Sequence, residues 1–121
     1  MQLQKVNPPK VTDIMISEIV KKIVENFYPE KIVLFGSRVW GVPKKWSDID
    51  ILVIVCLNES TTKLASKISI VAKPHYVPMD ILVRTPEEIE HRIKLGDHFI
   101  RKILTEGKVL YERRIGKRRR S

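Results

Sequence analysis

Three aspartates and a glycine–serine pair carry the strongest chemical signal in this sequence. Asp48 and Asp50 open an apolar run at residues 51–57, and ten residues separate them from Gly36-Ser37, which closes an earlier apolar run. Side chains two apart on a strand point to the same face. Two such carboxylates repel each other and are costly to desolvate, so a divalent cation would offset that cost. A bare Asp-x-Asp is more often a solvated strand start, and the upstream pair is what favours a metal site.

The pair Gly36-Ser37 suits a phosphate group. Glycine allows a ligand to approach the backbone closely, and a helical turn beginning just after it would point exposed amide groups at an anion. The Ser37 hydroxyl adds a donor and Arg38 adds positive charge. Gly-Ser alone is a common turn, but with the nearby acids it predicts nucleotide binding by Gly36, Ser37 and Arg38.

Asp80 supplies a third carboxylate, inside the otherwise apolar stretch 77–84. An isolated charge there is expensive unless the position is an exposed strand edge or strand start. Three carboxylates can hold two Mg²⁺ ions about 4 Å apart, which clamp the attacking and leaving oxygens of a phosphoryl or nucleotidyl transfer. Magnesium prefers carboxylate and phosphate oxygens. We therefore predict Asp48, Asp50 and Asp80 as both metal ligands and catalytic residues.

Hydrophobic spacing and turn signals predict the elements that position these residues. Apolar residues at helical spacing indicate helices bounded by residues 12–28, 60–73, 85–96 and 97–107, with a short helical piece within 36–41. Apolar, β-branched runs predict strands over 31–35, 48–57, 77–84 and 108–111. In the helix after Ser60, we expect Leu64, Ile68 and Val71 to be buried. The order predicts an α/β fold, a small mixed β-sheet with helices packed on one side.

Composition bounds the class of protein. The chain has 121 residues, 43% of them hydrophobic, which is enough for one compact domain and not two. No apolar run approaches the roughly 20 residues of a membrane span, and the first ten residues show no signal-peptide pattern. Cys56 is the only cysteine, and we expect it to be a small core residue. These features predict a cytoplasmic protein with no membrane partner.

Positive charge is concentrated at the C-terminus. The formal net charge is +9, and residues 111–121 hold six of the 23 basic residues and one of the 14 acidic ones. We therefore expect a single domain over residues 1–112 and a basic, disordered tail over residues 113–121. Such a tail can bind nucleic acid or an acidic partner, or it can be a solvated end with no dedicated partner.

Taken together, these features resemble the minimal nucleotidyltransferases of the DNA polymerase β superfamily. The signature of that family is Gly-Ser, ten residues, then Asp-x-Asp, and the chain keeps this spacing from Gly36-Ser37 to Asp48-Ile49-Asp50. Asp80 matches the family's third carboxylate, on a later strand. The resemblance covers roughly residues 13–112. It departs from the family in the loop after Arg38, where Val39-Trp40 is bulkier than usual.

The resemblance implies a polymerase β-like palm fold and a definite chemistry. A nucleotide triphosphate, ATP, would be the substrate, two Mg²⁺ ions the cofactors, and AMP the group transferred. Asp48 and Asp50 would ligate metal, while Asp80 would ligate the catalytic metal and help activate the acceptor hydroxyl. Gly36 and Ser37 would hold the triphosphate.

The resemblance also implies a partner. Small members of the family act as antitoxins beside a HEPN-type toxin protein, transferring AMP onto a tyrosine of the toxin, so we expect an oligomer with such a partner. One alternative is nucleotidyl transfer to a small molecule such as an aminoglycoside. Another is a non-catalytic antitoxin that neutralises its partner by binding, which the three intact acids disfavour. A fourth hypothesis is nucleic-acid binding through the basic tail.

Overall fold

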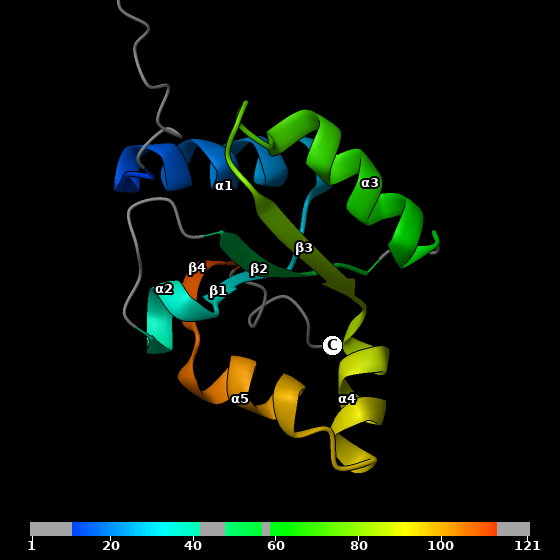
Figure 1. Cartoon of the computed structure of the whole chain (residues 1–121). Coiled ribbons are helices and arrows are strands. Elements are labelled where there is room, and N and C mark those ends of the chain that lie inside the picture. The colour runs from blue at the N-terminus through cyan, green and yellow to red at the C-terminus, as the bar shows by residue number, and fades with distance from the viewer. Residues whose placement is uncertain (1–10, 42–47, 57–58, 114–121) are drawn as a thin grey trace, which may run out of the picture.

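A four-stranded mixed sheet, in the order β3-β2-β1-β4, forms the centre of the molecule (Figure 1). The computed structural model describes residues 11–41, 48–56 and 59–113. Within these ranges the elements are α1 (Asp13–Phe27), β1 (Lys31–Phe35), α2 (Ser37–Trp40), β2 (Ile49–Ile54), α3 (Thr61–Ala72), β3 (Met79–Arg84), α4 (Pro86–Lys94), α5 (His98–Glu106) and β4 (Lys108–Glu112). β1 runs antiparallel to β2 and β4, whereas β2 runs parallel to β3.

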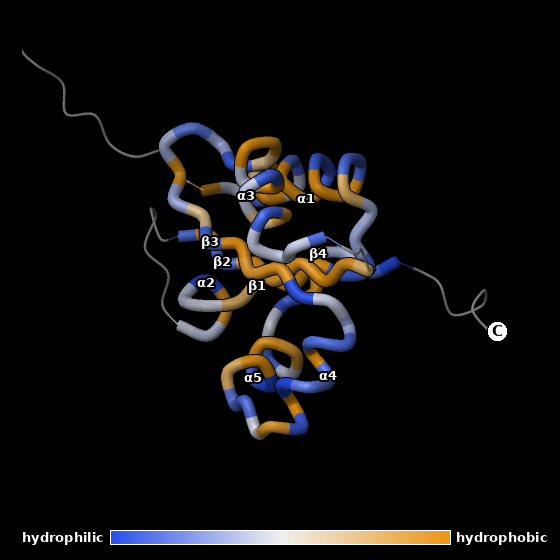
Figure 2. The backbone as a smooth tube through the Cα atoms, turned by 90° about the vertical axis from the view of Figure 1, so that its right-hand side faces the viewer, coloured by the Kyte–Doolittle hydropathy of each residue, from blue (hydrophilic) through white to orange (hydrophobic). Residues whose placement is uncertain are grey.

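Helices cover both faces of the sheet, with α1 and α3 on one side and α4 and α5 on the other (Figure 1). In Figure 2 the hydrophobic tube of β1 runs between these two helical layers. The predicted α/β class with a small mixed sheet is confirmed, but the expectation of helices on one side is wrong. The physical reason lies in β2, where Ile51 and Val53 pack toward α1 and α3 while Leu52 and Ile54 pack toward α4 and α5. A strand that is apolar on both faces must be covered on both.

Polar caps fix the helix boundaries at the predicted places. Thr12 accepts a hydrogen bond from the Met15 amide at the start of α1. Thr85 and Glu88 form a reciprocal capping box with Pro86 at the first helical position of α4, a pattern that satisfies two otherwise unpaired donors.

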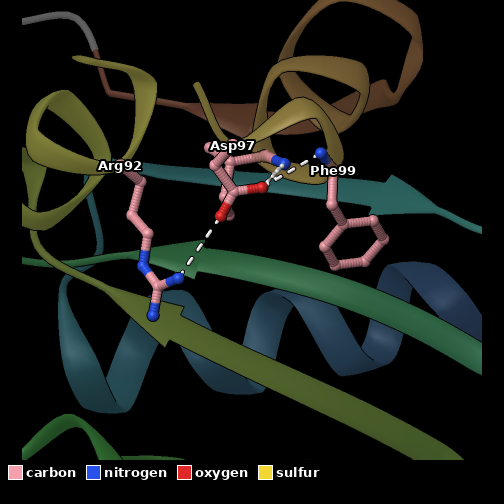
Figure 3. A network of polar contacts seen from close by, with 4 residues as sticks. Arg92, Asp97 and Phe99 are labelled. Carbon is pink, nitrogen blue, oxygen red and sulfur yellow. Dashed lines mark hydrogen bonds and ion pairs between the residues drawn. The ribbon is translucent and has the colours of Figure 1, made fainter. Parts of the chain in front are cut away.

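Asp97 joins α4 to α5 (Figure 3). Its carboxylate accepts hydrogen bonds from the Phe99 and Ile100 amides, both at 3.0 Å, and lies 3.4 Å from Arg92 Nη1. These amide bonds hold the pKa of Asp97 below its ordinary value, with a further contribution from Arg92. One side chain therefore both caps α5 and fixes its direction relative to α4.

Two local expectations need correction. Ala72 is buried in α3 in place of Val71, which is 40% exposed, because the buried row follows Leu64, Ile68 and Ala72 at intervals of four. Cys56 is exposed and donates a hydrogen bond from Sγ to Glu30, since β2 ends at Ile54 before reaching it.

Of the remaining expectations, one concerns the bounds of a strand, and two fall on residues that the structure does not describe. The predicted strand over 48–57 is shorter at both ends, so Asp48 lies just before β2. The predicted arm over residues 1–10 and the tail beyond Arg113 lie outside the described residues. In residues 11–41, 48–56 and 59–113, no helix is both long and apolar enough to span a membrane.

Candidate active site

The parallel pairing of β2 with β3 brings two of the three predicted acids together. Asp50 on β2 is in direct register with Asp80 on β3, and adjacent strands lie about 4.8 Å apart. Side chains in direct register point to the same face, so the two carboxylates are neighbours. Asp80 is exposed on β3, the strand at the edge of the sheet. Its charge therefore stays in contact with solvent, although the surrounding stretch of sequence is apolar. Asp48 is exposed immediately before β2.

The electrostatics of Asp50 show that the three acids act on one another. The pKa of the Asp50 carboxyl is raised from 3.8 to about 6, by burial first, then by the charges of Asp80 and Asp48, and by a hydrogen bond with Asp80. Partial burial beside two like charges disfavours the ionised form. Asp50 is therefore the centre of a strained acidic cluster, and positive charge placed there would relieve the repulsion.

Gly36 lies directly against this cluster. It follows Phe35, which pairs with Asp50 across β1 and β2, and its φ of +84° lies in the region that favours glycine. A Cβ atom at this position would overlap Asp50 Oδ2 and approach Asp50 Cγ to 3.1 Å. The sequence predicted that a phosphate group approaches the backbone at Gly36, and the group that lies against Gly36 in the structure is the Asp50 carboxylate.

The other two predicted nucleotide-binding residues lie on α2. Ser37 is exposed and opens the helix, and the Gly36 carbonyl accepts hydrogen bonds from the Val39 and Trp40 amides. Arg38 lines a cavity of about 380 Å³ between α1, α2 and β4, together with Asp13, Ile16, Ser17, Leu34, Lys108 and Leu110. None of the three acids lines that cavity. The structure thus brings Gly36 to the acids and places the Arg38 side chain along a different cavity.

An aromatic cluster that was not predicted from the sequence links α2 to β1 and α5. Phe35 contacts Trp40 with ring centroids 6.1 Å apart and Phe99 with centroids 5.6 Å apart. Lys102 Nζ lies 4.5 Å from the centre of the Trp40 ring, in cation–π geometry. Through these contacts Trp40 packs against β1 and α5. The same contacts attach the turn that contains Gly36 and Ser37 to α5.

The donor set fits a divalent cation. Carboxylate oxygens are the ligands that Mg²⁺ and similar hard cations prefer, and the raised pKa of Asp50 marks an excess of negative charge. Among the described residues, no group of three or more histidine, cysteine, aspartate or glutamate side chains is arranged to hold a metal ion by itself. The cluster is open, as a site is when substrate oxygens complete the coordination.

This fold and site define a nucleotidyltransferase. The family model described as nucleotidyltransferase domain matches residues 16–111, and the chain belongs to that family. Such domains generally use a nucleoside triphosphate and a divalent metal. A comparison with curated proteins gave no match.

Two solved structures are similar to this chain. One is a candidate nucleotidyltransferase from Sulfolobus solfataricus, with a TM-score of 0.55 and 20% identity over 83% of this chain and 79% of that one. The other is a mutant of the toxin–antitoxin MntA-HpeT, with a TM-score of 0.48 and 20% identity over 83% of this chain and 76% of that one. At this identity the first likeness shows the fold.

Proposed function

We propose that this chain transfers AMP from ATP to a hydroxyl group of a partner protein, as the antitoxin of a HEPN-type toxin. The observation that carries the chemistry is the register of Asp50 with Asp80 beside Gly36. Membership of the nucleotidyltransferase family supports the reaction class. The resemblance of the Gly-Ser and Asp-x-Asp spacing to minimal nucleotidyltransferases supports ATP and the toxin partner.

Each site residue has a role in this proposal. Asp48, Asp50 and Asp80 would hold two Mg²⁺ ions, which would supply positive charge to the attacking and leaving oxygens. Gly36 and Ser37 border the triphosphate. The acceptor hydroxyl oxygen bonds to the α-phosphorus as the bond to the pyrophosphate oxygen breaks, and a carboxylate oxygen of Asp80 receives the hydroxyl proton. Asp80 is suited to this because it is exposed on the outermost strand.

The openness of the site favours a macromolecular acceptor. Asp48 and Asp80 are both exposed, and so is Ser37, which follows Gly36. Small-molecule sites bury most of their ligand, whereas a hydroxyl presented by another protein reaches an open cluster without an enclosing pocket. The acceptor side of the reaction is therefore assigned to a protein partner, with which the chain forms a complex.

The test uses α-labelled ATP and Mg²⁺ with the purified chain and a HEPN-type protein encoded beside it. Asp48→Ala/Asp50→Ala removes two of the acids, and Glu18→Ala/Glu25→Ala is the matched control, since both glutamates are exposed on α1. We expect label on the partner with the wild type and the control, and none with the aspartate variant.

Two other results would contradict the proposal. Equal neutralisation of the partner by wild type and aspartate variant, without label, would mean that binding alone is responsible. Absence of both label and neutralisation, with label on an added aminoglycoside, would assign the chain to small-molecule transfer.

A further inference from the structure

A second concave surface lies at the opposite end of the sheet from the acids. It is a groove of about 570 Å³ formed by β1, β2, α4 and the end of β4. Its floor includes Ile54, Ile89 and Ile93. Ile54 pairs with Lys31 at the start of β1, whereas Asp50 pairs with Phe35 at its end. Four residues along a strand place the groove about 13 Å from the acid pair.

The rim of the groove is acidic in a strongly basic chain. Four glutamates and two cations line it, namely Glu30, Glu87, Glu90 and Glu112 with Lys31 and Arg113, whereas the whole chain carries +9. The Glu112 carboxylate lies 3.8 Å from Lys31 Nζ, and Glu30 accepts a hydrogen bond from Cys56. In the described part of the chain, neither Glu87 nor Glu90 has an ion-pair partner. The groove therefore offers two unmatched carboxylates above an apolar floor.

The last described residue, Arg113, lies at this groove, and the basic C-terminal residues follow it. Arg113 lines the groove, and its amide donates a hydrogen bond to the Glu30 carbonyl at 2.9 Å. Its Nε is buried without a hydrogen-bond partner among the described residues. Residues 114–120 follow directly, with five basic side chains, no acid and one large apolar residue, Ile115.

We propose that residues 114–120 bind in this groove of their own chain. Their cations pair with Glu87 and Glu90, and Ile115 packs on the isoleucine floor. The reach is sufficient, because seven extended residues span at most about 25 Å and the segment starts at the rim. Docking within one chain also avoids the loss of translational freedom that a separate partner would bring. The basic tail is then an intramolecular ligand, and its cations are withheld from nucleic acid.

Trypsin tests the proposal on the full chain, because the tail contains several cleavage sites. The nuclease-treated protein is digested at low ionic strength, and removal of the tail is followed by mass spectrometry. Glu87→Gln/Glu90→Gln removes the unmatched carboxylates, and Glu18→Gln/Glu25→Gln makes the same charge change on α1, away from the groove. Loss of two exposed ion pairs should speed tail removal by about threefold to tenfold in the groove variant, with no change in the control.

A tail substitution guards against loss of folding in the groove variant. Ile115→Asp removes the apolar anchor without altering any described residue, and it should also speed cleavage. Added salt should speed cleavage of the wild type because it screens exposed ion pairs. Equal rates for wild type, groove variant and Ile115→Asp would overturn the proposal. Protection that disappears on dilution would also overturn it, since the tail would then occupy a second copy.

Discussion

Neutralising Asp50 should stabilise the metal-free protein while abolishing its chemistry. Asp50→Asn keeps the shape of the side chain and removes the charge that burial, Asp80 and Asp48 all disfavour. A site built to hold positive charge is unfavourable for folding when that charge is absent. The structure therefore predicts opposite effects of one substitution on stability and on activity.

The magnitude and its pH dependence follow from the pKa of Asp50. A rise from 3.8 to about 6 corresponds to about 3 kcal/mol at most, which solvent screening of this partly exposed group reduces to about 1 to 2 kcal/mol. Between pH 3.8 and about 6 the folded state binds the proton more tightly than the unfolded state, so this contribution to stability falls as pH rises. The advantage of Asp50→Asn should thus be complete above pH 6 and vanish below pH 4.

The assay is urea denaturation of wild type and Asp50→Asn in chelator at pH 8 and at pH 4, with Glu25→Gln as an exposed control. We expect a gain in the free energy of unfolding for Asp50→Asn at pH 8 only, or about 4 °C in Tm per kcal/mol. A variant no more stable than wild type at pH 8, or equally stabilised at both pH values, would refute the reasoning about the acid cluster.

Three further predictions follow from the same structure. Addition of Mg²⁺ should raise the Tm of wild type but not of Asp50→Asn in a thermal shift assay, because a ligand stabilises only a folded protein that binds it. An equal rise for both proteins would refute the metal site. In denaturant titration, Gly36→Ala should lose more stability than Gly96→Ala. Both glycines have positive φ, but only a Cβ at Gly36 meets Asp50. Equal losses of about 1 to 2 kcal/mol would mean that backbone strain alone accounts for the effect. Thr85→Ala should cost about 1 kcal/mol in the same titration through loss of the capping box, and Thr85→Ser should restore most of it.

Local signals allowed most of the fold to be predicted. Strand ends and helix starts depend on neighbouring residues, and the caps at Thr12, Ser60, Thr85 and Asp97 are short-range hydrogen bonds visible in sequence. The pairing of Asp50 with Asp80 was inferred from chemistry, and the register of β2 with β3 now places them together. Their assignment as metal ligands stays a prediction.

Features that depend on packing in three dimensions were not predicted. The uninterrupted apolar run in β2 was a signal for helices on both faces of the sheet. Only the structure shows that α4 and α5 are the helices that cover the second face. The groove rimmed by Glu87 and Glu90 joins four segments far apart in sequence. The cavity lined by Arg38 likewise depends on the position of β4 beside α1, which no local pattern specifies.

The position of β3 at the edge of the sheet has a consequence for how the site is held together. Asp50 lies on β2 and Gly36 directly follows β1, and both of these strands pair on both sides, whereas Asp80 comes from a strand paired only with β2 within the described sheet. Edge elements open locally at lower free energy than central ones. A brief fraying of one strand would therefore remove the third acid while the two central strands stay folded. The acid cluster can come apart and reassemble faster than the protein unfolds.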